Sequence, residues 1–280
     1  MLDYLRIAKA WTIGILTLFL VPLCSFAGVV YGNTRQPGGK ALFKERSEEA
    51  STLPANAKPH KGEIVFLLHG LMRNNQDMML LQKELVKRGY KTCNWSYASD
   101  RFSIKELGKQ LKELIDKTPM TTIHFVGHSM GGIVIRSYMD QFKPTNVGRV
   151  VMIGTPNSGA SIASLFSDYE LFKKSFGPAA IELASDSQKG LAQPADFPNT
   201  EFAVIAGGTG TKYGMNPLIK GDNDGLVATE EAKLKGAKCF TIVPLHHMII
   251  HLEKSTIQKT ANFIEFGFFD APGNTSKSNE

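Results

Sequence analysis

Short runs of apolar residues alternate with amphipathic helical patterns along most of the chain. Residues 64–68 are apolar at every position, which is typical of a strand buried on both faces of a sheet. Residues 77–88 then carry apolar side chains at helical spacing, and Gly89 favours an end to the helix. The same reasoning predicts strands at 90–97, 121–126, 149–153, 201–206 and 238–243, and helices at 104–115, 131–142 and 256–266. Such alternation predicts a mainly parallel, doubly wound α/β sheet with helices on both faces.

The stretch 158–199 interrupts this alternation, within a body that we expect to span 62–269. It is partly helical, so we expect a short helical cap over one end of the sheet. The helical patterns lie at 164–174 and 178–185. The flanking segments 32–61 and 270–280 are rich in small and polar residues without a sustained period, which predicts a linker and a flexible tail.

The N-terminal segment 1–31 has the pattern of an export signal. Residues 10–34 carry no charge, and Arg6 and Lys9 precede them. A bilayer core of about 30 Å needs ~20 such residues in a helix, and the basic flank favours a cytoplasmic N-terminus. An uncleaved signal anchor and a signal peptide cleaved after residues 25–27 both fit this pattern. The first predicts a membrane-anchored domain on the periplasmic or extracellular side, and the second a secreted one.

Charge and composition exclude several classes of protein. The 280 residues are 42% apolar and 21% charged, which excludes a disordered chain and a polytopic membrane protein. The formal net charge is +6, but residues 61–280 hold 25 Lys and Arg against 22 Asp and Glu, without a basic cluster. Nucleic acid is therefore not an expected partner. Three scattered cysteines predict neither a disulfide framework nor a zinc site.

A candidate nucleophile lies in the segment Gly-His-Ser-Met-Gly at 127–131, between a predicted strand and a predicted helix. Glycines two residues before and two after Ser129 permit a tight turn that lifts the serine hydroxyl out of the sheet. The amide of Met130, at the helix N-terminus, would then stabilise a developing oxyanion. Gly70 permits a sharp turn after an early strand, so the amide of Leu71 is the expected second donor.

A serine hydroxyl needs a base, and the base needs an orienting carboxylate. In a strand–turn–helix site of this kind the chain order is serine, acid, histidine. The candidate bases are therefore His246, His247 and His251, which follow the last predicted strand. Two candidate acids, Asp222 and Asp224, lie on the glycine-rich turn before it, although a turn carboxylate also caps its own backbone. The residues alone leave these alternatives open.

Four motifs together resemble the lipase/esterase branch of the α/β-hydrolase superfamily, the triacylglycerol-lipase-like serine hydrolases. They are His-Gly-Leu at 69–71, Gly-His-Ser-Met-Gly-Gly at 127–132, Gly-Thr-Pro-Asn-Ser-Gly at 154–159 and Asp-Gly-Leu-Val at 224–227. The resemblance covers roughly 62–269 and implies an α/β-hydrolase fold. It implies that Ser129 is the nucleophile, Asp224 the triad acid, and Leu71 and Met130 the oxyanion donors, with no cofactor or metal.

The resemblance also distinguishes among the histidines. Related sequences carry the catalytic histidine three residues after a proline, which here is Pro244, and this spacing implies His247. Counting back from the apolar triplet that follows allows His246 instead. The strand order of the superfamily further implies that Cys93 and Cys239 lie several strands apart, too far for a disulfide.

The function that the resemblance implies is hydrolysis of carboxylic esters, of lipid or acyl type, through an acyl-enzyme. The expected partners are a small-molecule or lipid ester and, through the N-terminal segment, a membrane. A phospholipase, a thioesterase or an acyltransferase would use the same site. A membrane-tethered binding module without activity is the alternative from another class of protein.

Overall fold

The computed structural model describes residues 58–184 and 191–271, all within one compact unit, Arg46–Glu280. The predicted anchor or signal peptide at 1–31 lies outside these residues, as do most of the predicted linker and tail. Within the described ranges, no helix has the length and apolar character needed to cross a bilayer. Export and membrane attachment therefore stay predictions from the sequence.

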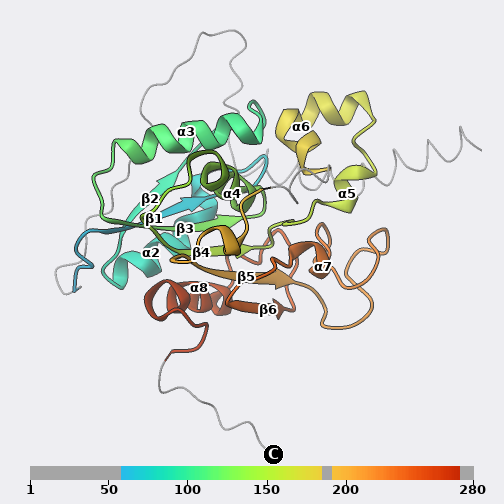
Figure 1. Ribbon diagram of the computed structural model, residues 1–280. Helices are drawn as coiled ribbons and strands as arrows, with labels where there is room; N and C mark the ends of the chain where they lie inside the picture. Colours follow the sequence, from blue (N-terminus) through green and yellow to red (C-terminus); the bar gives the residue numbers. More distant parts are fainter. Residues whose placement is uncertain (1–57, 185–190, 272–280) are drawn as a thin grey trace, which may run out of the picture. The chain divides into compact units, whose positions relative to one another are not determined.

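The described residues contain one parallel sheet with the strand order β2-β1-β3-β4-β5-β6 (Figure 1). The strands are β1 (Glu63–Leu68), β2 (Lys91–Trp95), β3 (Thr122–His128), β4 (Val147–Ile153), β5 (Glu201–Gly207) and β6 (Cys239–Val243). The predicted parallel, doubly wound sheet is confirmed. The strand expected at 90–97 ends earlier, because Tyr97 leaves the sheet and stacks on His69 with ring centroids 4.1 Å apart.

Helices cover both faces of the sheet (Figure 1). They are η1 (Asn75–Met78), α2 (Met79–Lys87), α3 (Ile104–Asp116), α4 (Met130–Phe142), α5 (Ser161–Ser164), α6 (Glu170–Leu183), η3 (Pro194–Asp196), α7 (Thr229–Ala232) and α8 (Lys254–Phe266). Alternate side chains of β1 show the two layers. Phe66 and Leu68 pack with the apolar residues of α3 and α4, whereas Val65 and Leu67 pack with those of α2 and α8. This two-sided burial explains why β1 is apolar at consecutive positions.

The segment between β4 and β5 differs in detail from the predicted helices. The pattern indicated helices at 164–174 and 178–185, whereas the structure has the single turn α5 and then α6, kinked at Gly177. Gly177 has φ 76° and ψ −177°, which are not helical values, and Pro178 has no amide hydrogen to donate, so α6 is interrupted just before 178, where the second helical pattern begins. The Glu182 carboxylate accepts a hydrogen bond from the Ile104 amide at 3.0 Å, which joins α6 to the start of α3.

One buried cation holds both ends of this segment. Arg136 of α4 is fully buried, and its guanidinium donates to the carbonyl of Asn157 at 2.7 Å, before α5. It also donates to the carbonyls of Leu191 at 3.2 Å and Ala192 at 2.9 Å, after α6. Burial lowers the pKa of Arg136 to about 10, which leaves the group charged at neutral pH.

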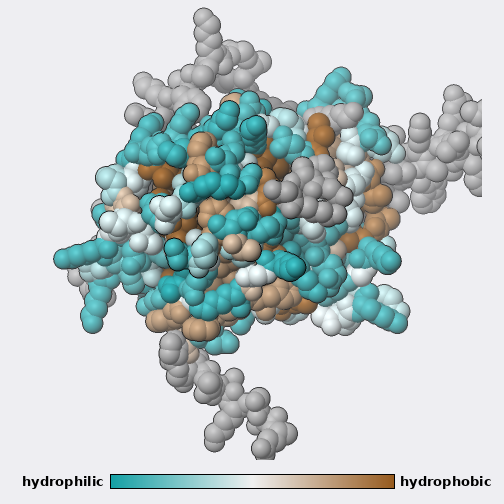
Figure 2. All heavy atoms as spheres, in the orientation of Figure 1, coloured by the Kyte–Doolittle hydropathy of each residue, from teal (hydrophilic) through white to brown (hydrophobic). Residues whose placement is uncertain are grey.

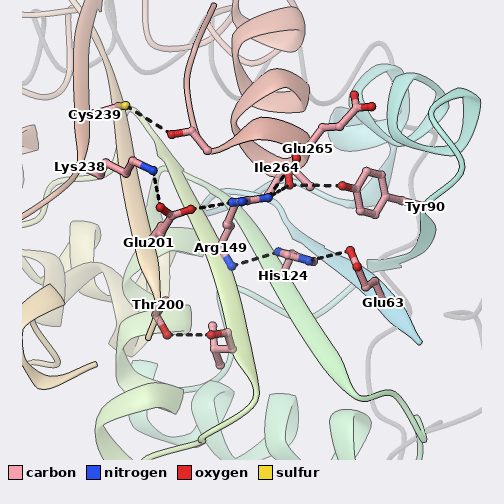
Figure 3. A network of polar contacts seen from close by, with 12 residues as sticks. Glu63, Tyr90, His124, Arg149, Thr200, Glu201, Lys238, Cys239, Ile264 and Glu265 are labelled. Carbon is pink, nitrogen blue, oxygen red and sulfur yellow. Dashed lines mark hydrogen bonds and ion pairs between the residues drawn. The ribbon is translucent and has the colours of Figure 1, made fainter. Parts of the chain in front are cut away.

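A polar network joins the strands at the edge of the sheet where they begin (Figure 3). The Glu201 carboxylate accepts from Arg149 at 2.8 Å and pairs with Lys238, and Arg149 also donates to the last carbonyls of α8. These contacts tie β4, β5, β6 and α8 together at the opposite end from the candidate nucleophile. Cys93 and Cys239 are free and lie on the two outermost strands, β2 and β6.

Candidate active site

Ser129 forms a sharp turn between β3 and α4. Its backbone has φ 54° and ψ −123°, a conformation that L-residues rarely adopt, and it is the N-cap residue of α4. A Cβ at Gly127 would overlap the amide of Gly132, and a Cβ at Gly131 would overlap the carbonyl of Leu68. Glycine is therefore required on both sides of Ser129, because the turn packs against its own helix and against the end of β1.

The structure brings Ser129, His247 and Asp224 together. His247 Nε2 lies 2.9 Å from Ser129 Oγ, and His247 Nδ1 lies 2.8 Å from Asp224 Oδ2. A carboxylate accepts and cannot donate, so Nδ1 carries the proton and Nε2 is free to accept the serine hydroxyl. The imidazole thus has the tautomer that a general base needs.

The turn that carries Asp224 fixes the orientation of its carboxylate. Asp224 is 1% exposed, and its Oδ1 accepts hydrogen bonds from the amides of Leu226 at 3.0 Å and Val227 at 2.8 Å. The His247 amide donates to the Asp224 carbonyl at 2.9 Å, so the two residues are joined through their backbones as well. A carboxylate held by two amides and one imidazole has little freedom to rotate away.

The other acidic and basic candidates lie elsewhere. The Asp222 carboxylate accepts from the amides of Thr209 at 2.7 Å and Gly210 at 3.0 Å, so it caps a neighbouring loop. His246 is exposed, and its Nδ1 accepts from the Met248 amide at 3.3 Å. His251 is buried behind the site, where its ring stacks on that of His128.

The segment after β1 lies against the nucleophile. A Cβ at Gly70 would be 3.1 Å from the Ser129 Cβ, so only glycine allows this approach without displacement. The His69 ring holds the segment, because its Nδ1 donates to the Gly70 carbonyl at 2.9 Å and its Nε2 accepts from the Tyr97 amide at 3.3 Å. The His69 ring therefore stabilises the loop through these hydrogen bonds. The loop brings Leu71, the expected oxyanion donor, next to the Ser129 turn.

Each predicted oxyanion donor is adjacent in sequence to a residue at the nucleophile turn. Met130 follows Ser129 directly as the first residue of α4, and Leu71 follows Gly70. Within the described part of the chain, neither of these two amides donates to another protein group. An oxyanion site requires amide donors of this kind, and the role of Leu71 and Met130 stays a prediction.

Sequence reasoning did not find two neighbours of this site. Gly154 has φ 58°, and a Cβ there would be 3.3 Å from the His247 ring. His128 Nε2 donates to the His247 carbonyl at 3.2 Å. Gly154 is the first residue of the Gly-Thr-Pro motif, so the sequence did contain a signal for it. His128 was disfavoured as a base because it precedes the nucleophile, and its contact with His247 depends on the tertiary structure.

The buried histidines predict that the fold loses stability in acid. Burial lowers the pKa of His69 to about 4 and that of His251 to about 3, and it also lowers the pKa of His128. An unfolded histidine titrates near 6.5, so below that pH the unfolded chain takes up protons that the folded chain does not. The free energy of unfolding should therefore be highest above pH 6.5 and fall as the pH approaches 4, by about 2 kcal/mol per histidine at pH 5.

Urea unfolding of the full chain at pH 7.0, 6.0 and 5.0 measures this loss. His251→Gln removes one of the titrating groups, and its stability should depend less steeply on pH over this range than that of the wild-type chain. A midpoint urea concentration of unfolding that stays constant from pH 7 to pH 5 would contradict the prediction.

Among residues 58–184 and 191–271, no cluster of three His, Cys, Asp or Glu side chains is arranged to hold a metal ion. The described site itself holds a hydroxyl, an imidazole that can remove its proton, and a carboxylate that orients the imidazole.

Comparison with known proteins identifies the fold. A family model of the alpha/beta hydrolase fold matches residues 87–176. The lipase BlEst2 of Bacillus licheniformis, in its mature form, superposes with a TM-score of 0.60 at 19% identity, covering 78% of this chain and 96% of that one. In its propeptide form the TM-score is 0.58 at 19% identity over 72% of this chain, which spans about half, 49%, of that chain.

Two further solved structures share the fold. The phospholipase PlaB of Legionella pneumophila has a TM-score of 0.55 at 16% identity, with 72% of this chain and 59% of that one covered. An esterase of Exiguobacterium antarcticum has a TM-score of 0.54 at 14% identity, with 72% and 92% covered. No curated protein sequence matches the chain. The chain has the α/β-hydrolase fold that the sequence predicts, and the solved structures that share this fold include a lipase, a phospholipase and an esterase.

Proposed function

We propose that the chain is a serine hydrolase that cleaves carboxylic esters. The observation that carries this proposal is the hydrogen-bonded series from Ser129 through His247 to Asp224. Ser129 Oγ attacks the ester carbonyl while His247 Nε2 takes the hydroxyl proton, and the imidazolium then protonates the leaving alcohol. Asp224 stabilises the imidazolium. Water, activated by the same histidine, hydrolyses the acyl-enzyme and restores the serine.

In this proposal the amides of Leu71 and Met130 bind the oxyanion of the tetrahedral intermediate. Each donor of this kind contributes on the order of 3 kcal/mol to transition-state stabilisation. Because Met130 begins α4, the partial positive charge at the helix N-terminus acts in the same direction. No metal or organic cofactor is needed for these steps.

Lipid or acyl esters are the proposed substrates. The segment between β4 and β5 leaves the same edge of the sheet as the Ser129 turn, where ligands of open α/β sheets bind. This segment exposes the large apolar side chains of Leu165, Tyr169 and Ile181. Figure 2 shows apolar residues on the right of the view, where Figure 1 places α5 and α6. The structures that share the fold include a lipase, a phospholipase and an esterase, and this supports the same class of substrate.

A fluorophosphonate probe tests the nucleophile, and a panel of esters tests the substrate class. We expect the purified full chain to be labelled at Ser129 and to hydrolyse p-nitrophenyl esters, with higher kcat/KM for chains of eight or more carbons than for acetate. Activity limited to two to four carbons would contradict the lipid class but leave the esterase. Absence of both labelling and hydrolysis would favour the binding module without activity.

Further substrates separate the related activities. A phospholipase, thioesterase or acyltransferase would also be labelled at Ser129, because the probe reports the nucleophile and not the leaving group. Phospholipid vesicles, acyl thioesters and an added acceptor alcohol then distinguish the three. Faster turnover of any of these than of p-nitrophenyl esters would replace the assignment.

A further inference from the structure

His128 occupies a position between the proposed base and the proposed oxyanion segment. It is the last residue of β3, directly before Ser129, and it is 2% exposed. Its ring stacks on that of His251 with centroids 3.9 Å apart, and it is tilted by 40° to the ring of His247, with centroids 5.1 Å apart. Neither the nucleophilic attack nor the proton transfer described above uses this imidazole.

The hydrogen bond of His128 fixes its tautomer. His128 Nε2 lies 3.2 Å from the His247 carbonyl oxygen, and a carbonyl only accepts, so Nε2 carries the proton. Burial lowers the pKa of the ring well below its usual value, which keeps it neutral. Nδ1 is then a lone-pair nitrogen, and it has no hydrogen-bond partner among the described residues.

The Nδ1–Cε1 edge of the ring, next to Nε2, faces the oxyanion segment. A Cβ at Gly70 would lie 3.3 Å from His128 Nδ1 and 3.6 Å from its Cε1, so the backbone of this segment rests on the imidazole. One ring therefore contacts the residue before Leu71 through its Nδ1–Cε1 edge and the backbone of His247 through Nε2. Both contacts are made from the residue next to the nucleophile.

We propose that His128 is a positioning residue that sets the base and the oxyanion segment at the correct separation around Ser129. This inference rests on the proposed function. The Nε2–H donor holds the His247 carbonyl, and thereby the backbone from which the catalytic imidazole extends. The ring supports Gly70, and thereby the amide of Leu71. Loss of the donor leaves a buried carbonyl unpaired, and the base loop shifts to satisfy it.

Two substitutions separate the hydrogen bond from the shape of the ring. His128→Phe keeps a planar ring beside Gly70 but has no donor. His128→Gln loses the ring but places an amide nitrogen close to where Nε2 lies. A displacement of about 1 Å in a reacting group costs on the order of 100-fold in rate. We therefore expect kcat for p-nitrophenyl butyrate to fall between about 10- and 100-fold in the phenylalanine variant, with KM changed less than about twofold.

Rescue by the glutamine variant is the decisive part of the test, with kcat expected within about threefold of the wild-type value. The matched control is His124→Phe, on the same strand four residues earlier. His124 is also buried, but it bonds to Arg149 and Glu63 at the opposite edge of the sheet (Figure 3). This control should lower the melting temperature without lowering kcat, because it removes a buried histidine far from Ser129.

The outcomes distinguish the alternatives. Equal kcat in the phenylalanine and glutamine variants, whether both are active or both impaired, overturns the positioning role of the donor. If the phenylalanine variant does not fold, His128→Asn replaces it, because the shorter amide cannot reach the His247 carbonyl. Equal kcat for asparagine and glutamine then overturns the proposal. A wild-type chain that neither reacts with a fluorophosphonate nor cleaves esters refutes the proposed function itself.

Discussion

Replacing Ser129 by alanine is expected to lower kcat/KM for p-nitrophenyl esters by about a million-fold. Without the hydroxyl there is no acyl-enzyme, and His247 alone has only water to activate. The fold should be unchanged, because the hydroxyl bonds to the His247 ring and alanine suits the turn as well as serine does. Initial rates with the wild-type and alanine chains, together with the mass of the chain after fluorophosphonate treatment, measure the effect.

Thermal unfolding supplies the control for this variant, and the two melting temperatures should agree within a few degrees. Labelling of the alanine variant at another serine, or a rate above one per cent of the wild-type value, would show that Ser129 is not the nucleophile. The triad proposed from the hydrogen bonds would then have to be abandoned.

The second large effect is expected for Asp224→Asn, with a loss of about 10⁴-fold in kcat. The amides of Leu226 and Val227 select an oxygen at one end of the new side chain, so its NH₂ group faces His247 Nδ1. The imidazole must then accept at Nδ1 and carry its proton on Nε2. In this tautomer it cannot remove the proton of Ser129, although every heavy atom keeps its place.

Asp222→Asn is the matched control, because it makes the same chemical change two residues earlier. Asp222 bonds to Thr209 and Gly210 and has no contact with His247, so activity should stay within about threefold of the wild-type value. Steady-state rates of both variants, with their melting temperatures, make the comparison. A greater loss in the Asp222 variant than in the Asp224 variant would contradict the assignment of the acid.

Much of the fold follows from local pattern. Residues 64–68 are buried on both faces of the sheet, so every position is apolar. This unbroken apolar run can be recognised in the sequence without knowledge of the tertiary structure. The end of β2 gave no such signal, since Tyr97 is as apolar as a strand residue and leaves the sheet only to meet His69. The interruption of α6 at Gly177 was, in contrast, predictable, because the second helical pattern begins at the residue after it, Pro178.

The candidate site was predictable to the extent that chain order and turn chemistry constrain it. Ser129 was indicated by the glycines that its turn requires, and those glycines are tightly packed in the structure. The sequence left three histidines as candidate bases. Adjacent residues such as His246 and His247 differ only in the direction of their side chains, which is set by the conformation of the loop. The contact between His128 and the His247 carbonyl joins residues 119 positions apart, and no local pattern encodes it.

The buried guanidinium of Arg136 has a consequence for how this protein can diversify. It donates hydrogen bonds to the carbonyl of Asn157 and to those of Leu191 and Ala192, so the segment between them is an insert whose two ends are held by the same side chain. Within the insert, the Glu182 carboxylate bonds to the Ile104 amide, so changes that keep this contact and the two ends leave the connection to the sheet in place. The exposed part of this insert can therefore vary in sequence while the chain around Ser129 keeps its fixed ends.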